Sequence, residues 1–142
     1  MTIAAILAAK GRDIVSISPN ATVMDATTLL AQRRIGAVPV MEDGRVVGIF
    51  SERDVIHALD NHGVAALAQP VGDVMTSPAI SVAPADAVMA ALSLMSRRRI
   101  RHLPVESGGE VVGFVSIGDL VKYRIDRIEA DASAMRDYIQ SA

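Results

Sequence analysis

Residues 48–54 read GIFSERD and residues 113–119 read GFVSIGD, so one pattern of glycine, serine and aspartate occurs twice, 65 positions apart. Laying residues 6–60 over residues 71–125 without a gap gives 17 identical positions in 55. Unrelated sequences match at only about one position in fifteen. The chain is therefore a tandem duplication of one unit, with a period longer than that of the usual solenoid repeats.

Each unit predicts the same order of elements. A short β-like stretch at residues 14–17 is followed by a Ser-Pro-Asn turn and a helix that starts at about Thr22. Two apolar strands then flank a turn at Asp43-Gly44, or at Gly108-Gly109 in the second unit, which is typical of a β-hairpin. The repeated serine and aspartate begin a further helix, expected over residues 52–59 in the first unit and from Ile117 onward in the second.

The predicted fold class is α+β, with two tandem β-α-β-β-α repeats. A unit with a three-stranded sheet and two helices is marginally stable alone, so the copies should pack sheet to sheet about a pseudo-twofold axis, with a cleft at the join. We expect the first repeat over residues 1–62, a linker with about one helical turn over 63–70, the second repeat over 71–126 and a C-terminal helical extension over 127–142.

Composition excludes several classes of protein. The formal net charge is -2, so no overall field recruits nucleic acid or an anionic membrane. The chain has no cysteine, His57 and His62 have no partner at metal-ligand spacing, and no set of nucleophile, base and orienting group can be assembled. We expect no metal, no membrane partner and no enzymatic activity. The N-terminal apolar stretch is not typical of a signal peptide, which favours a cytoplasmic protein.

The paired pattern of a hydrophobic residue before Pro-Val, a glycine turn, and then Gly, Ser and Asp resembles the cystathionine β-synthase (CBS) domain, here as the tandem pair called a Bateman module. The stretch VGDVMTSPAISV from Val71 resembles the usual start of a second CBS repeat. The resemblance covers nearly the whole chain. It implies a sensor rather than a catalyst, and it implies AMP, ADP, ATP, sometimes NAD or S-adenosylmethionine as the ligand, with no obligatory cofactor.

The resemblance also implies a role for individual residues. The hydroxyl and carboxylate of each Ser-x-x-Asp motif would bind ribose, residues of the first strand and those before the hairpin proline would enclose adenine, and basic residues near that proline would meet phosphate. The implied residues are, for ribose, Ser51, Asp54, Ser116 and Asp119; for adenine, Ile14, Val15, Val38, Ala79, Ile80 and Leu103; for phosphate, Arg101, His102 and Arg53.

Two of these motifs have a purely structural explanation as well. Ser-x-x-Asp has the form of a helix capping box, which needs no ligand. The basic cluster at residues 97–102 begins at a helix C-terminus, where Arg97 and Arg98 would offset the helix dipole. Arg101 and His102 lie beyond that helix, and their counterparts in the first repeat are Gly36 and Ala37. The two halves are therefore chemically unequal.

The C-terminal helix carries an apolar stripe at spacings of 4, 3, 4, 3 and 4 residues with no counterpart in the first repeat. This helix either packs on its own body or makes a dimer contact, and we expect a homodimer. The function indicated is a sensor that signals the occupancy of its cleft to an unknown regulated partner. The alternative is an interaction module that dimerises and has vestigial pockets. The stripe consists of Val121, Ile125, Ile128, Ala132, Met135 and Ile139.

Overall fold

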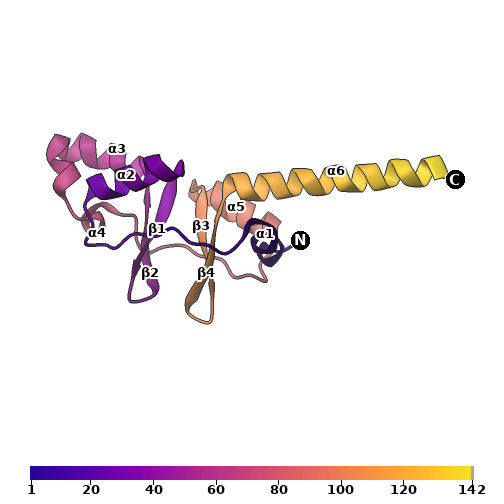
Figure 1. Cartoon of the computed structure of the whole chain (residues 1–142), viewed down its shortest axis with the longest axis horizontal. Helices are drawn as coiled ribbons and strands as arrows, with labels where there is room; N and C mark the ends of the chain where they lie inside the picture. The colour runs from indigo at the N-terminus through magenta and orange to yellow at the C-terminus, as the bar shows by residue number, and fades with distance from the viewer. Residues whose placement is uncertain (142) are drawn as a thin grey trace.

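Two β-hairpins form the centre of the protein, whose computed structural model describes residues 1–141. Strands β1 (Ala37–Glu42) and β2 (Arg45–Ser51) form one antiparallel sheet, and β3 (His102–Ser107) and β4 (Glu110–Ser116) form the other. Each hairpin closes on two residues of positive φ, Asp43 and Gly44 or Gly108 and Gly109. Both contain an irregularity at the equivalent place, after Val40 and after Val105. The duplication predicted from the sequence is confirmed, and β2 contacts β4 where the halves meet (Figure 1).

The expected third strand of each sheet is reduced to one residue. Ile17 makes a single parallel bridge to Val40, and Val82 makes one to Val105. The turn at Ser18 follows at once, so pairing cannot continue past residue 17. Residues 14–16 make no bridge to β1, so the prediction of a three-stranded sheet was wrong.

The helices begin where the sequence indicates. Helix α2 (Val23–Arg33) starts at Thr22, whose hydroxyl accepts the N–H of Asp25 at 3.1 Å, and α3 (Glu52–His62) starts at Ser51. Helix α5 (Val88–Arg98) is the counterpart of α2 in the second half. The predicted linker contains the expected helical turn as the 3₁₀ helix η1 (Gly63–Ala68), followed by the short helix α4 (Val71–Val74). Helix α3 is three residues longer than predicted.

Each half has its own hydrophobic core. The first contains the buried face of α2 and Phe50 of β2. The second contains the equivalent face of α5 and also helix α1 (Ile3–Lys10), whose Ile3, Ile6 and Leu7 are buried. Residues 3–10, which the sequence analysis assigned to the first repeat, therefore pack in the second half.

Helix α1 occupies the place in the second half that α4 occupies in the first. The N–H of Val71 donates to the carbonyl of Ala21 at 2.7 Å, and the N–H of Ile3 donates to that of Asp86, the counterpart of Ala21, at 2.9 Å. The difference is length, because α4 ends at Val74 and its chain becomes extended, whereas α1 continues to Lys10.

Helix α6 (Ile117–Ser141) extends well beyond the body (Figure 1). Leu120 is buried and Tyr123 packs on the second core, but Ile128 is 52% exposed and Ile139 is 65% exposed. The possibility that the apolar stripe packs on its own body is therefore wrong for the part beyond Tyr123.

Substitutions at Gly48 and Gly113 test whether the hairpins depend on the close packing of α1 and of the segment that begins with α4. A Cβ at Gly48 would lie 2.9 Å from the carbonyl oxygen of Thr76, and one at Gly113 would lie 2.5 Å from Leu7 Cδ2. We expect Gly113→Ala to destabilise the protein by about 1–3 kcal/mol and Gly48→Ala to cost more, because backbone cannot rotate away as a side chain can. Urea unfolding measures both.

Gly118→Ala is the matched control, because its nearest neighbour, Ser116 Oγ, lies at 3.6 Å and the position is helical. It should leave stability unchanged or raise it by up to about 1 kcal/mol. Wild-type stability in Gly48→Ala would contradict this account of the packing.

Candidate functional site

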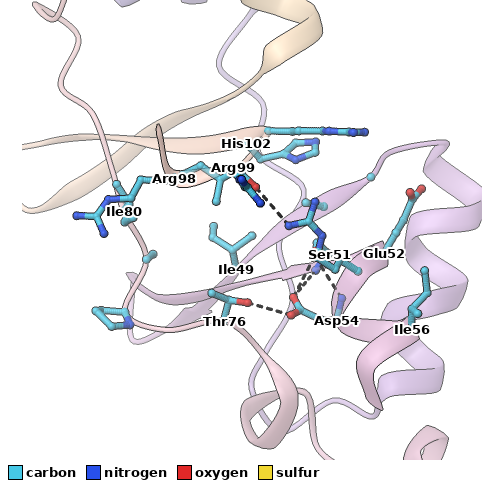
Figure 2. A pocket seen from close by; sticks show the side chains of 17 residues that line it. Ile49, Ser51, Glu52, Asp54, Ile56, Thr76, Ile80, Arg98, Arg99 and His102 are labelled. Atoms are coloured by element: carbon cyan, nitrogen blue, oxygen red, sulfur yellow. Dashed lines mark hydrogen bonds between the residues drawn. The ribbon is translucent and has the colours of Figure 1, made fainter. Parts of the chain in front are cut away.

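A cavity of about 540 Å³ lies at the join between the halves. Its walls come from the first hairpin and the start of α3, from the segment after α4, and from the turn between α5 and β3 (Figure 2). In this view Asp54 and Thr76 lie at one end and Arg99 and His102 at the other, with Ile49 between them. The lining residues are Gly36, Ala37, Ile49, Ser51, Glu52, Arg53, Asp54, Ile56, Thr76, Pro78, Ala79, Ile80, Arg98, Arg99, Ile100, Arg101 and His102.

Asp54 forms an acidic corner where β2 passes into α3. Its Oδ2 accepts the N–H of Ser51 at 2.8 Å and the hydroxyl of Ser51 at 3.1 Å. Ser51 Oγ in turn accepts the N–H of Asp54 at 3.4 Å, so the capping box proposed from the sequence is present. Capping fixes the carboxylate in one orientation at the cavity wall.

Thr76 completes this corner, and the sequence analysis did not identify it. Its hydroxyl donates to Asp54 Oδ1 at 2.9 Å, and its backbone exchanges two hydrogen bonds of 2.9 Å with Ile49. Thr76 follows Asp54 by 22 residues, across α3 and the linker, so no spacing rule connects them. The absence of a side chain at Gly48 leaves room for this segment to lie on β2.

Four arginines and two carboxylates line the cavity, in a chain whose net charge is negative. Arg53 and Arg101, the predicted phosphate contacts, are both there. Arg98 also lines the cavity, although the sequence analysis assigned it to a solvated helix end. Arg53 Nη1 donates to the carbonyl of Arg99 at 3.3 Å, which links α3 of the first half to the end of α5 in the second.

The wall between these polar ends is apolar, and it includes Ile49, Ile80 and Ala79. Of the six predicted adenine contacts, Ala79 and Ile80 line the cavity. Val38 and Leu103 are each 0% exposed in the two cores. Alternation along the strands explains this, because the cavity side is taken by their neighbours Ala37 and His102.

The other two predicted adenine contacts, Ile14 and Val15, do not line the cavity either. Val15 packs on the first core, and Ile14 is half-buried. The segment that contains them meets β1 only at Ile17.

His102 lies at the join, close to residues of both halves of the protein. Its ring stacks on Phe114 with a centroid distance of 5.7 Å, and a Cβ at Gly36 would approach its Cε1 at 3.3 Å. Burial lowers the pKa of His102 below 6.5, and the positive charge of Lys10 lowers it further, against the opposing effects of Asp119 and Glu52. Near neutral pH His102 can therefore offer an anion an N–H but not a full charge.

The second acidic corner is built differently. Ser116 and Asp119 form the same capping hydrogen bonds, 2.9 Å to Asp119 Oδ2 and 3.1 Å to Ser116 Oγ. Here, however, Lys10 Nζ forms an ion pair with Asp119 Oδ2 at 2.6 Å and donates to the carbonyl of Phe114 at 2.7 Å. Lys10 was not identified from the sequence.

One ammonium group thus takes the place of two of the three hydrogen bonds of Thr76, although it bonds to the capping oxygen Oδ2 rather than to Oδ1. Phe114 is the counterpart of Ile49 and Asp119 is that of Asp54, so the lysine bonds to the equivalents of both groups that Thr76 contacts. Burial alone would raise the pKa of Asp119. The hydrogen bonds from Lys10 and the Ser116 N–H, with the lysine charge, outweigh burial and hold the pKa below its ordinary 3.8.

The comparisons with known proteins agree with this architecture. The family model for the CBS domain matches residues 10–61 and 71–126. The chain is 34% identical over 107 residues to the CBS domain-containing protein YhcV of Bacillus subtilis, which covers 75% of this chain and 76% of that protein. It is 35% identical over 124 residues to the mitochondrial CBS domain-containing protein CBSX3 of Arabidopsis thaliana, covering 84% of this chain and 60% of that protein.

Solved structures give the same result. The CBS-domain containing protein ATU1752 from Agrobacterium tumefaciens superposes with a TM-score of 0.84 at 38% identity, over 87% of this chain and 92% of that one. The CBS domain pair of protein MJ0100, solved with 5-methylthioadenosine and S-adenosyl-L-methionine, shares the fold with a TM-score of 0.78 at 22% identity, over 89% and 98%. Two pseudo-symmetric halves with a cavity at their join are also the architecture of these CBS domain pairs. The chain belongs to the CBS domain family and carries a tandem pair of these domains.

Catalytic relatives match only in part. Inosine-5'-monophosphate dehydrogenase of Korarchaeum cryptofilum is 35% identical over 127 residues, but these are 24% of that enzyme. Within residues 1–141, no helix combines the length and the apolar character needed to cross a membrane.

Replacing Lys10 by Met tests the second corner. At pH 7 we expect the free energy of unfolding to fall by about 0.5–1 kcal/mol. The effect is small because the ion pair is partly exposed and screened by solvent. The folded-state pKa of Asp119 is depressed, so this stability is present above pH 3.8 and is lost as the pH falls through the folded-state pKa. The difference from wild type should therefore shrink in acid.

Urea unfolding at pH 7 and pH 3 measures this effect. Lys122→Met is the matched control, since Lys122 is exposed and makes no ion pair with the rest of residues 1–141. Equal losses for both variants at pH 7 would rule out a specific role for Lys10.

Proposed function

We propose that the cavity binds the adenosine part of an adenine nucleotide, AMP, ADP, ATP or NAD, and that the protein is a non-catalytic sensor of that ligand. The observation that carries the proposal is the acidic corner at Asp54, fixed at one end of an apolar wall that has arginines at its far end. A cavity of about 540 Å³ is within the usual range for small-ligand sites.

Asp54 is suited to bind the ribose. Its Oδ2 is committed to Ser51, which orients the carboxylate, while Oδ1 accepts one hydrogen bond, from the Thr76 hydroxyl. A carboxylate oxygen can accept more than one hydrogen bond. The adjacent hydroxyls of a ribose would therefore bind Oδ1 beside Thr76 or in its place, with Ser51 Oγ within reach of the same group.

The apolar wall and the arginines suit the two other parts of a nucleotide. Ile49, Ile80 and Ala79 offer the base a surface that excludes water. Arg53 and Arg101 would meet phosphate, since guanidinium groups bind phosphate oxygens in pairs. His102 would add an uncharged N–H donor.

Ligand binding would be signalled through Arg53. This side chain belongs to α3 and bonds to the carbonyl of Arg99 at the end of α5, so it links the halves in the free protein. A phosphate would compete with that carbonyl and favour a different packing of the halves. Such a shift requires that the two arrangements differ in affinity for the nucleotide.

We propose one nucleotide per chain. In the second corner Lys10 bonds to Asp119 Oδ2 and to the Phe114 carbonyl, so an ammonium group, not a hydroxyl, lies against the carboxylate that a second ribose would use. Ser116 and Asp119 would then serve to cap α6 and to anchor α1. In the ribose role first assigned to them, a second ribose would have to bind Asp119 while Lys10 neutralises its charge.

The cellular context is part of the same proposal. The chain would act in the cytoplasm as a homodimer on a regulated protein of unknown identity. The complex of MJ0100 with 5-methylthioadenosine and S-adenosyl-L-methionine supports an adenosine-containing ligand, and it makes S-adenosylmethionine a necessary member of any ligand panel. Failure of every such ligand to bind would leave the alternative, an interaction module with vestigial pockets.

Asp54→Ala tests the ribose contact. We expect the affinity for the best-binding nucleotide to fall by about ten- to a hundredfold, because a charge-assisted hydrogen bond is worth about 1.5–3 kcal/mol. Isothermal titration calorimetry should give one site per wild-type chain.

Asp25→Ala is the matched control. Asp25 caps α2 through the same hydrogen bonds to Thr22 but does not line the cavity. The Asp25→Ala variant should lose about as much stability as Asp54→Ala and should bind the nucleotide with wild-type affinity. An unchanged dissociation constant for Asp54→Ala would refute the ribose role.

Arg101→Ala tests the phosphate contact by comparing AMP with adenosine. The wild type should prefer AMP, and the variant should lose most of that preference while its adenosine affinity stays within about twofold. Arg45→Ala, on β2 outside the cavity lining, is the control. An equal loss of affinity for AMP and for adenosine would indicate that Arg101 has a structural role instead.

A further inference from the structure

Helix α6 presents an apolar seam, defined here as Val121, Ile125, Ile128, Ala132, Met135 and Ile139. These residues take the alternating a and d positions of a heptad repeat. The large members are 42% to 65% exposed. They form a continuous row along most of the helix rather than scattered surface residues.

The body of the protein does not use this seam. Leu120 and Tyr123 attach α6 to the second core. Each helical residue turns the side chain by about 100°, so Val121 points roughly a quarter-turn away from Leu120. Beyond Tyr123 the helix extends free of the body (Figure 1). A solvated helix of this length is marginal on its own, so the seam requires a cover.

The charged residues beside the seam indicate what packs on it. Arg124 and Asp131 take g positions, and Glu129 and Arg136 take e positions. In a parallel, in-register pair of helices, each g residue meets the e residue five positions further along the second copy. Arg124 would then face Glu129 of the second copy, and Asp131 would face Arg136. Both contacts join opposite charges, and symmetry makes each of them twice.

An antiparallel pair would be unfavourable. With the seams aligned about residue 130, g residues meet g residues and e residues meet e residues. Asp131 would face Asp131 of the second copy, Glu129 would face Glu129, and Lys122 would face Arg136. Within residues 1–141 none of the four charges forms an ion pair in its own chain, so all remain available.

We infer that a second copy of this chain packs on the seam, so that residues 121–139 form a parallel, in-register two-stranded coiled coil. The interaction does not depend on nucleotide binding. It gives the expected homodimer a specific interface and a specific orientation.

Single cysteines test the orientation, because the chain has none of its own. Ile125→Cys and Ile139→Cys lie at the two ends of the seam, about 21 Å apart along the helix. In a parallel pair each variant meets its own copy, so both should form disulfide-linked dimers on mild oxidation. An antiparallel pair can link at most one of them. Linkage of only one, or of neither, would overturn the inference.

Charge exchange tests the interface. Glu129→Arg/Asp131→Arg places like charges at all four contacts, and so does Arg124→Glu/Arg136→Glu. We expect each double variant to dimerise at least about tenfold more weakly than wild type, and an equimolar mixture of the two to recover wild-type affinity as a heterodimer. Sedimentation velocity measures all three.

Asp126→Arg/Asp137→Arg is the matched control, because it makes the same change of charge at positions away from the seam. It should dimerise as wild type does. A wild-type protein that stays monomeric at 100 µM, or a dimer unaffected by either charge variant, would refute the proposed interface.

Discussion

The structure depends on two places where a missing side chain lets a distant segment lie on a hairpin. At Gly48 the segment around Met75 and Thr76 covers β2, and at Gly113 the side chain of Leu7 covers β4. These close approaches bring Thr76 to one acidic corner and Lys10 to the other. The hairpins thus determine where the halves meet, and the glycines leave room for a covering segment at each corner.

The duplication is close in sequence, yet it does not produce two equal sites. Both corners keep the same serine and aspartate, and both use them to cap a helix. The segment that covers each corner differs. At Asp54 an extended chain presents the neutral hydroxyl of Thr76, and at Asp119 the end of helix α1 presents the ammonium group of Lys10. Within residues 1–141 Asp54 therefore has a neutral partner at Oδ1 and no ion pair, whereas Asp119 is neutralised by an ion pair. The electrostatic difference between the halves comes from Lys10 and Thr76, which lie within the matched units but are not aligned with each other.

Much of the fold was predictable from local signals: the hairpins from their glycine turns, α2 and α3 from their caps, and the duplication from identity alone. Contacts between distant segments were not. The attachment of α1 to the second core needs Ile3 to meet Asp86, and nothing local indicates it. In the site, Arg53, Arg101 and Asp54 were predicted and line the cavity, whereas Arg98 was assigned to a solvated helix end. Val38 and Leu103 were predicted to line the cavity, but strand alternation turns them into the cores. The positions of Thr76 and Lys10 at the two corners result from tertiary packing, and no local sequence signal indicates them.

The position of α1 has a consequence for biosynthesis. Its apolar face is made first, but the core that buries it includes Leu120, and its terminal lysine bonds to Asp119. At about 5–20 residues per second, roughly 5 to 20 seconds separate the translation of the two partners. Throughout that interval the apolar face of α1 lacks the part of the second core that buries it.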